Sequence, residues 1–317
     1  MDNFSYSILA YYLFTPVANP QAEVAAHHAF FTSRDVTSRI YISEQGINGQ
    51  MSASLADGEA YMEWLKAKPE FAAIQFKIQP HHEHVFPRTT VKYRQQLVAL
   101  DQEVNLQQRG DYLSPAEWKA MLEADEAPLL LDVRNDYEWK LGHFEGAVSP
   151  PCTTFRDFLN FAEQLKSRTD PQNTPVMMYC TGGIRCELFS SVLKEKGFQK
   201  VYQLEGGVIN YGKKQGDAHW LGKLFVFDDR LAVPLEEHST APVIGKCHHC
   251  DAPNETYHNC ANMDCNELFL CCSNCVREWK GCCQEACVTA PRVRPYHQVS
   301  HKPFRKSHHY VQLKGVS

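Results

Sequence analysis

The sequence predicts an α+β domain, then an α/β domain, then a cysteine-rich segment. Three observations carry this prediction. The first hundred residues alternate strand and helix patterns in the order βαββαβ, strand and helix units follow from Leu113, and ten of the 13 cysteines fall between Cys247 and Cys287. A length of 317 residues suits two or three domains. We expect the parts to be residues 1–105, 106–225 and 226–290, with a basic tail over 291–317.

The first domain is expected to have a ferredoxin-like architecture, because its element order is βαββαβ. Aromatic and branched residues predict strands, and apolar residues at helical spacing predict helices. The strands are expected at 5–14, 38–43, after a turn at Asn48-Gly49, at 74–78 and at 90–97, and the helices at 20–32 and 57–68. This architecture hosts many functions and therefore identifies none.

The second domain shows the signals of a parallel sheet covered by helices. Ser114, followed by a proline and an acidic residue in the first turn, predicts a helix start. The continuous apolar runs at 129–133 and 175–179 predict strands buried on both faces. A helix is expected at 186–196, with Gly197 just beyond its end, and another strand at 201–204.

A loop with a specific chemistry joins the strand at 175–179 to the next helix. It begins with Cys180 and ends with Arg185. Glycines let successive backbone N–H groups point inward as an anion cradle, the helix start adds positive potential, and the arginine adds a fixed cation. These features favour the thiolate over the thiol, so we expect Cys180 and Arg185 to be catalytic. The expected cradle consists of Thr181, Gly182, Gly183 and Ile184.

Neighbouring residues are expected to support this loop. Asp132 stands at a strand end beside Arg134, which is typical of a structural ion pair, and we expect the two to brace the loop. Cys186 follows the cradle, where it could form a disulfide or persulfide with Cys180, although a passive place in the first helical turn is favoured. Cys152 is expected to be an ordinary thiol.

Three stretches of the second domain resemble a known family. LLLDVRNDYEWKLGHFEGAVSPP (129–151), CTGGIRCE (180–187) and YQLEGGVINY (202–211) are similar to the entry motif, active-site loop and closing motif of rhodanese-type sulfurtransferase domains. The resemblance implies that Cys180 can carry a persulfide whose anionic sulfur the cradle stabilises. The four residues between Cys180 and Arg185 are one fewer than in the related phosphatases, which argues against phosphatase activity.

The cysteine-rich segment has the spacing of structural zinc sites. Pairs of thiols two to four residues apart recur over about forty residues, which lets both sulfurs of a pair reach one tetrahedral ion. The sequence allows two interleaved sites, with one residue from each adjacent pair and with His248, His249 or His258 as alternative ligands. Disulfides are the other interpretation, and zinc is favoured over them in a reducing compartment. The expected ligands are Cys247, Cys250, Cys260, Cys265, Cys271, Cys275, Cys282 and Cys287.

Composition and charge indicate the cellular compartment in which the protein works. Few cysteines outside the segment favour a reducing compartment, so we expect a cytoplasmic protein. The apolar run at 8–14 follows no Lys or Arg, and no run is long enough to cross a bilayer, so we expect neither a signal peptide nor a membrane span. The overall charge of -5 is the sum of -11 over residues 1–290 and +6 over the tail.

The tail combines those cations with aromatic residues and has no acid. This combination suits phosphate contacts and base stacking, although a merely solubilising tail is an equal alternative. The expected RNA-binding residues are Arg292, Arg294, Lys302, Arg305 and Lys306.

The whole order of parts resembles one family over nearly the entire chain. With SEQGING (43–49), GHFEGA (142–147), CTGGIRCE and NCANMDCNELFLCCSNC (259–275), the chain is similar to the TrhO family of tRNA uridine hydroxylases. The resemblance implies tRNA as substrate and dioxygen as co-substrate. It also implies an oxidoreductase reaction that hydroxylates C5 of the wobble uridine to give 5-hydroxyuridine.

The sequence leaves the mechanism and two other functions open. The Cys180 thiolate could add to C6 of uracil, or a Cys180 persulfide could take part in oxygen activation. The chain has no flavin or nicotinamide fingerprint and no evident non-haem iron triad, so the electron donor is unidentified. The alternatives are a sulfurtransferase that carries a Cys180 persulfide and a non-enzymatic RNA-binding or persulfide-carrier module.

Overall fold

The computed structural model describes residues 4–98, 104–126, 128–150, 157–236, 239 and 241–295. The chain divides into two units, residues 1–133 with 150–214 and residues 134–149 with 215–317. Within the described residues, no helix combines the length and the apolar character that a membrane crossing requires.

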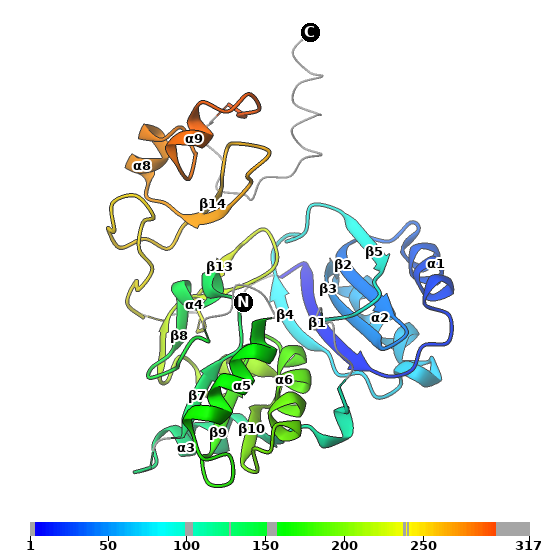
Figure 1. The fold of residues 1–317 in the computed structure, drawn as a ribbon. Helices are drawn as coiled ribbons and strands as arrows, with labels where there is room; N and C mark the ends of the chain where they lie inside the picture. The colour runs from blue at the N-terminus through cyan, green and yellow to red at the C-terminus, as the bar shows by residue number, and fades with distance from the viewer. Residues whose placement is uncertain are drawn as a thin grey trace. The chain divides into compact units, whose positions relative to one another are not determined.

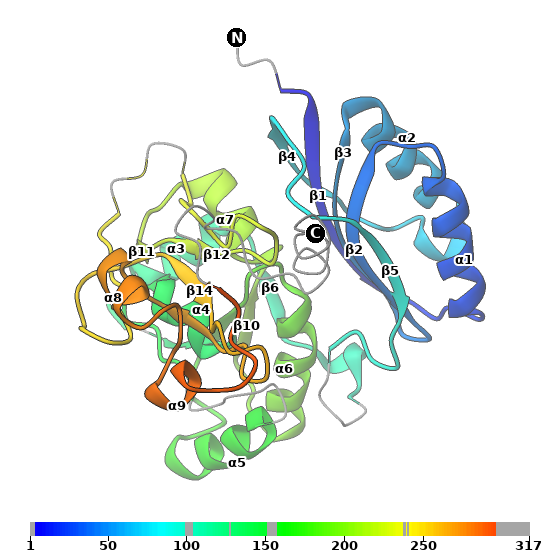
Figure 2. The ribbon, with the colours of Figure 1, turned by 90° about the horizontal axis from the view of Figure 1, so that it is seen from above.

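The N-terminal part of the first unit is a sheet with helices on one face (Figures 1 and 2). Its strand order is β4-β1-β3-β2-β5, in which the first four positions have the predicted ferredoxin-like order and β5 extends the edge parallel to β2. The strands are β1 Tyr6–Phe14, β2 Val36–Ser43, β3 Gly46–Ser54, β4 Lys77–His81 and β5 Thr89–Tyr93, and the helices are α1 Pro20–Phe31, α2 Leu55–Lys66 and the short η1 Pro69–Phe71.

Two local predictions in this sheet were wrong. The turn lies at Glu44-Gln45, and Asn48-Gly49 stands inside β3. Gly49 faces Tyr11 on β1, and a Cβ there would lie 2.2 Å from the tyrosine ring, so this glycine serves close packing and not a turn. The strand expected at 74–78 begins at Lys77, because Ile74 is a buried residue of the preceding turn.

The rest of the first unit contains a four-stranded parallel sheet of order β6-β10-β9-β7. Helix α6 packs on β9 and β10, and α5 packs on α6. Because the strands are parallel, the residues after β7, β9 and β10 meet at one edge of the sheet. The elements are η2 Leu106–Gln108, β6 Asp111–Leu113, α3 Pro115–Leu122, β7 Leu129–Asp132, α5 Phe158–Arg168, β9 Val176–Tyr179, α6 Ile184–Glu195, β10 Val201–Leu204 and α7 Gly207–Gln215.

Helix boundaries here follow the sequence signals closely. Ser114 caps α3 in a complete capping box with Glu117, as predicted. Gly197 follows the end of α6 with a φ of 100°, which fits its predicted place. Helix α6 begins at Ile184, two residues before the predicted start.

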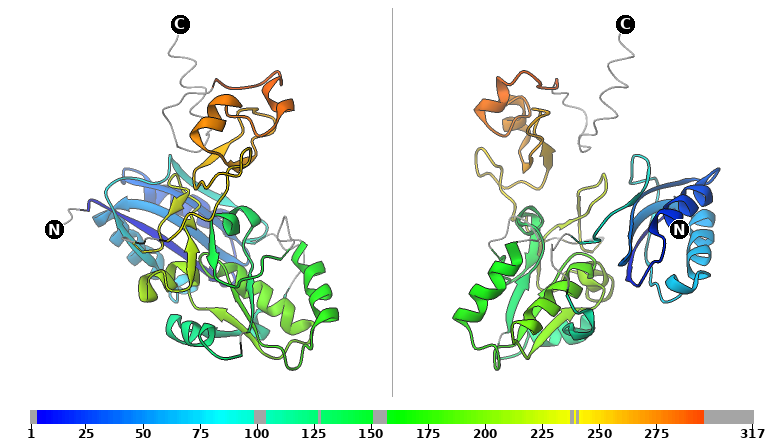
Figure 3. Two further views of the ribbon diagram at one scale, coloured as in Figure 1. Left: turned by 90° about the vertical axis from the view of Figure 1, so that its left-hand side faces the viewer. Right: turned by 45° about the vertical axis from the view of Figure 1, so that its right-hand side comes forward.

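The second unit is built from short elements. Strand β8 pairs with β11, β12 with β13, and β14 with β15. Figure 3 shows the cysteine-rich segment, in orange, as the β14–β15 hairpin followed by two short helices. The bounds are α4 Asp136–Leu141, β8 Gly142–Phe144, β11 Trp220–Gly222, β12 Leu224–Phe225, β13 Ala232–Val233, β14 Tyr257–Asn259, β15 Leu268–Leu270, α8 Ser273–Glu278 and α9 Glu285–Val288.

Candidate active site around Cys180

Cys180 stands where the sequence predicts, directly after β9 and just ahead of the four residues that precede Arg185. Its side chain is completely buried. Gly183 takes a φ of 104°, which turns the chain back, and its backbone N–H donates a hydrogen bond to Cys180 Sγ over 3.1 Å. The loop therefore presents a backbone donor to the sulfur, as an anion cradle does.

The environment of Cys180 favours its ionised form. Burial raises the pKa of this thiol, but hydrogen bonds from Cys186 and from the Cys186 and Arg185 amides, with the Arg185 charge, outweigh burial and lower the pKa from 9.0 to about 6. A thiol with a pKa below 7 is mostly thiolate at pH 7. An ionised thiol of this kind can act as a nucleophile or carry sulfur.

Cys186 supports Cys180 as a hydrogen-bond donor. It is completely buried in the first turn of α6, and burial and the neighbouring Cys180 raise its pKa well above 9.0. Cys186 thus keeps its proton and shares it with the Cys180 thiolate. Sequence reasoning left this residue passive or resolving and did not find this donor role.

Arg185 both places a positive charge near Cys180 and orders the loop by a hydrogen bond. Its guanidinium is buried, and Nη2 donates a hydrogen bond to Thr181 Oγ1 over 3.2 Å. Thr181 is itself buried. The arginine therefore links the last residue of the loop to the first one after Cys180.

Residues 207–209, in the closing motif YQLEGGVINY, contact the backbone of the Cys180 loop. The backbone N–H groups of Val208 and Ile209 donate hydrogen bonds to the carbonyl oxygens of Cys180, at 3.0 Å, and Thr181, at 3.1 Å. Gly207 has a φ of 68°, and a Cβ there would lie 2.5 Å from the Cys180 carbonyl oxygen. Only glycine permits this approach, which explains why the closing motif carries it.

The N-terminal sheet adds two residues that sequence reasoning missed. Lys77 on β4 donates a hydrogen bond from Nζ to the carbonyl oxygen of Gly182 over 2.8 Å. The Tyr12 hydroxyl on β1 is so close to Gly183 that a Cβ there would lie 2.8 Å from it. No local sequence signal marks either residue, because each reaches the loop from more than a hundred positions away.

Glu187 is a buried residue at the centre of a hydrogen-bond network behind the cradle. Its carboxylate accepts hydrogen bonds from the hydroxyls of Tyr12 and Tyr112, each at 2.8 Å, and its Oε2 lies 3.3 Å from Arg109 Nη1. Burial and the Glu187 charge raise the pKa values of both tyrosines, so both stay protonated donors. The network fixes the first turn of α6, which carries Arg185 and Cys186.

Each of the two residues expected to brace the loop has a described contact. Asp132 accepts a hydrogen bond from the hydroxyl of Tyr179, the residue before Cys180, at 2.8 Å. Arg134 donates from Nη2 to the carbonyl oxygen of Gly142 at 2.5 Å, and its guanidinium lies 5.1 Å from the centre of the Trp220 ring. Their role as braces stays a prediction, with Asp132 placed to act on the strand end.

The cysteine-rich segment brings together two groups of four thiols in the predicted interleaved order. Two of the predicted members differ. Cys271 and Cys282 lie outside both groups, and their neighbours Cys272 and Cys283 take their places. The Cys271 and Cys282 S–H groups instead face the carbonyl oxygens of Cys272 and Lys280. Adjacent cysteines cannot be told apart by spacing, because a shift of one residue changes the side-chain direction but hardly the spacing.

The predicted RNA-binding residues are only partly described. Arg292 pairs with Asp264 at 2.6 Å, and Arg294 donates to the carbonyl oxygen of Asn259 at 2.5 Å. Lys302, Arg305 and Lys306 lie outside the described residues.

Comparison with known proteins follows the same three parts. Residues 6–97 match the family model of the UPF0176 acylphosphatase like domain, residues 114–214 match the Rhodanese-like domain, and residues 221–288 match Rhodanase C-terminal. The fold and the Cys180 loop thus define a protein with a central rhodanese domain.

Full-length relatives define the family. The chain is 64% identical over 309 residues to the tRNA uridine(34) hydroxylase of Protochlamydia amoebophila, covering 97% of this chain and 96% of the relative. It is 56% identical to the protein of the same name from Chlamydia felis, covering 96% of this chain and 94% of the relative, and 54% identical to the one from Chlamydia trachomatis serovar D, covering 96% and 93%. The chain belongs to the tRNA uridine(34) hydroxylase family.

Proposed function

We propose that this protein hydroxylates C5 of the wobble uridine of tRNA, with dioxygen as co-substrate and Cys180 as the reacting residue. The observation that carries the proposal is the 64% identity, over 97% of the chain, to a relative named for hydroxylation of tRNA uridine 34. The ionised, cradled thiol of Cys180 supplies the chemistry. The cytoplasm, which holds tRNA, is the proposed site of action.

In the proposed reaction, the Cys180 thiolate adds to C6 of uracil. A carbon–sulfur bond forms, and the π electrons of the C5–C6 double bond move toward C5, which becomes electron-rich. One oxygen atom then joins C5, the C5 proton leaves and the thiolate is expelled. The other oxygen atom leaves as water, so the turnover takes two electrons and two protons from a reductant.

The backbone and side-chain groups around Cys180 have distinct roles in this reaction. The backbone N–H of Gly183 and the S–H of Cys186 stabilise the negative sulfur before attack and after expulsion. Arg185 holds positive charge beside the same atom. These groups are ordered by hydrogen bonds to Thr181 and by the Glu187 network, so the cradle is formed before substrate arrives.

Sulfur transfer is the second candidate, and the short cradle favours it. A persulfide on Cys180 would place its outer sulfur among the same donors. Transfer of that sulfur to uridine, with two electrons and two protons from a reductant and with the uracil oxygen leaving as water, would give a thiouridine and restore the Cys180 thiol. Mass alone separates the products poorly, because replacing oxygen by sulfur and adding oxygen raise the nominal mass equally.

Labelled dioxygen separates the two functions. The protein is expressed in cells whose own tRNA lacks the modification, so that the cell supplies the reductant, and the cells grow under ¹⁸O₂. We expect the label in the wobble nucleoside with the wild-type chain and no modified nucleoside with Cys180→Ala. A modified but unlabelled nucleoside would contradict hydroxylation and support sulfur transfer. Modification that survives Cys180→Ala would show that Cys180 does not take part in the reaction.

A further inference from the structure

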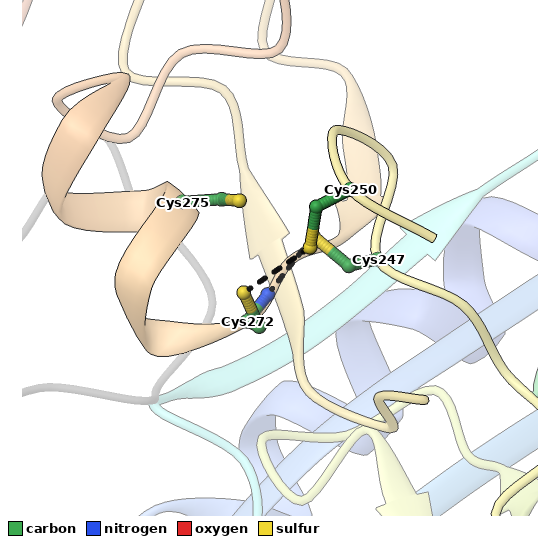
Figure 4. A group of neighbouring side chains, drawn as sticks. All are labelled: Cys247, Cys250, Cys272 and Cys275. Carbon is green, nitrogen blue, oxygen red and sulfur yellow. Dashed lines mark hydrogen bonds between the residues drawn. The ribbon is translucent and has the colours of Figure 1, made fainter. Parts of the chain in front are cut away.

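Two groups of four cysteines lie in the cysteine-rich segment, apart from the chemistry of Cys180. The first consists of Cys247, Cys250, Cys272 and Cys275, and the second of Cys260, Cys265, Cys283 and Cys287. Figure 4 shows the sulfurs of the first group pointing toward one another, two from a loop and two from the start of α8. Within each group, all four sulfurs lie within 4.8 Å of one another.

The spacing of the sulfurs fits ligands around a metal ion better than it fits disulfide bonds. The sulfurs of Cys250 and Cys272 are 3.8 Å apart, those of Cys265 and Cys283 are 3.6 Å apart, and those of Cys283 and Cys287 are 4.0 Å apart. A disulfide joins its sulfurs at about 2.05 Å. Four sulfurs at about 2.3 Å from a tetrahedral zinc ion are about 3.8 Å from each other. The described cysteines are all free thiols, so their spacing is that of ligands around one centre.

Backbone and side-chain donors already support these sulfurs. The Cys272 amide points at Cys247 Sγ over 3.4 Å, and the Cys283 amide points at Cys260 Sγ over 3.5 Å. In the second group, Asn262 Nδ2 also donates to Cys287 Sγ over 3.4 Å. Such donors stabilise ligating thiolates and fix their direction. The same amide-to-sulfur contact occurs in both groups, which indicates that the two sites have similar local structures.

Two histidines of this segment, His248 and His249, contact backbone carbonyl groups. Nε2 of His248 is 2.9 Å from the Cys283 carbonyl oxygen, and Nε2 of His249 is 3.1 Å from the Cys282 carbonyl oxygen. The His249 ring also stacks on Trp279. These contacts run from the loop of the first group to the backbone of the second, so the two groups share a framework.

The segment needs such a centre to hold its fold. Its core cluster contains ten buried residues, of which seven are cysteines and the apolar others are Ala261, Phe269 and Val276. A core with so few large apolar side chains buries too little surface to offset the entropy of folding, and small domains of this kind depend on metal or disulfides. The described cysteines form no disulfide, so metal binding is the additional stabilisation that fits this core.

We propose that each group binds one structural Zn²⁺ through four thiolates, which gives two zinc ions per chain. Binding at each site releases four protons from the thiols and leaves zinc in its +2 state. The interleaved order of the ligand pairs along the chain means that each ion closes a loop containing part of the other site. Zinc is preferred to other ions because a closed tetrahedral site of four sulfurs is its usual structural site.

The test measures metal in the full-length protein. Native mass spectrometry and elemental analysis are expected to give two zinc ions per chain, and X-ray absorption is expected to give four sulfurs at about 2.3 Å. Absence of metal, or iron in its place, would overturn the proposal, as would a coordination shell containing nitrogen. These measurements use the unaltered chain and do not depend on how a variant folds.

Variants then test the ligand sets. Cys272→Ser and Cys283→Ser are each expected to lose one zinc or more, whereas Cys272→His restores a ligand and is expected to retain two. Cys271→Ala and Cys282→Ala are matched controls, since these buried cysteines adjoin the ligands but lie outside the groups. Loss of zinc from Cys271→Ala with two ions kept by Cys272→Ser would show that the assignment is wrong.

Discussion

The Nζ of Lys77 donates a hydrogen bond to the carbonyl oxygen of Gly182 over 2.8 Å, which places a partly buried cation from the N-terminal sheet on the loop that carries Cys180. Burial lowers the pKa of Lys77 from 10.5 to about 8, and the Cys180 charge opposes that effect. With the pKa of Cys180 at about 6, the thiolate and the ammonium are both charged between pH 6 and 8. The N-terminal domain therefore acts on the charge of the loop.

Removing this cation is expected to raise the pKa of Cys180. In Lys77→Met, the thiolate loses a nearby positive charge, and we expect the pKa to move upward from about 6 by roughly one unit. Lys77→Arg keeps the charge and is expected to stay near the wild-type value. The measurement is a pH titration of the thiolate absorbance that Cys180→Ala removes. An identical titration for Lys77→Met would show that Lys77 has no electrostatic effect on the site.

The S–H of Cys186 is expected to matter through the same pKa. Cys186→Ala removes a hydrogen bond that favours the Cys180 thiolate, so the pKa of Cys180 should rise and tRNA modification near pH 6 should fall more than modification at pH 8. Cys186→Ser keeps a donor and serves as the control. If the alanine and serine variants lose activity equally at both pH values, the packing of Cys186 and not its proton is what matters.

Gly207 is expected to tolerate no side chain. Alanine there would place a Cβ 2.5 Å from the Cys180 carbonyl oxygen and 2.8 Å from the Gly183 nitrogen, so Gly207→Ala should displace the loop and abolish modification. Gly197→Ala is the matched control, because Gly197 also has a positive φ but a Cβ there would meet no atom within 4 Å. The control should lose about 1–2 kcal/mol of stability through backbone strain and keep its activity. Thermal unfolding and nucleoside analysis check both variants. An active Gly207→Ala variant would show that the close approach of Gly207 does not hold the Cys180 loop in place.

Local signals explain what the sequence could predict. The cradle was predictable because Cys180, two glycines and Arg185 occupy one short stretch whose backbone geometry follows from its residue types. The capping box at Ser114 is equally local. By contrast, Tyr12 and Lys77 reach the loop only through tertiary packing, which no pattern of neighbouring residues encodes.

The adjacent cysteines mark another limit. Spacing predicted two interleaved groups, but whether Cys271 or Cys272 faces the centre depends on the direction of each side chain at the start of α8. The prediction of a turn at Asn48-Gly49 was wrong for a similar reason. Asn-Gly is a strong turn signal, yet here the missing side chain makes room for the Tyr11 ring.

The start of the basic tail belongs to the cysteine-rich segment. The amide of Arg294 donates to the Ala261 carbonyl at 3.0 Å, the amide of Met263 donates to the Arg292 carbonyl at 2.9 Å, and Val293 forms a bridge with Asn262. Burial lowers the pKa of Arg294 to about 10. A truncation at Pro291 would therefore remove part of a folded segment together with any RNA contacts.

Truncation after Pro295 separates these effects, because it keeps the packed residues and removes four cations, Lys302, Arg305, Lys306 and Lys314. If these cations bind phosphates, tRNA affinity should fall, and the dependence of log Kd on log salt should become shallower by roughly 0.7–0.9 for each phosphate that is no longer neutralised. A full-length variant with the four cations changed to Gln should give the same shallower slope, since it removes charge and keeps length. Fluorescence anisotropy with labelled tRNA over a range of KCl concentrations measures both quantities. Unchanged affinity and slope in both variants would assign the tail a role other than binding tRNA. A lower affinity at constant slope would place the interaction in base stacking, because stacking on the tail's aromatic residues releases few counterions.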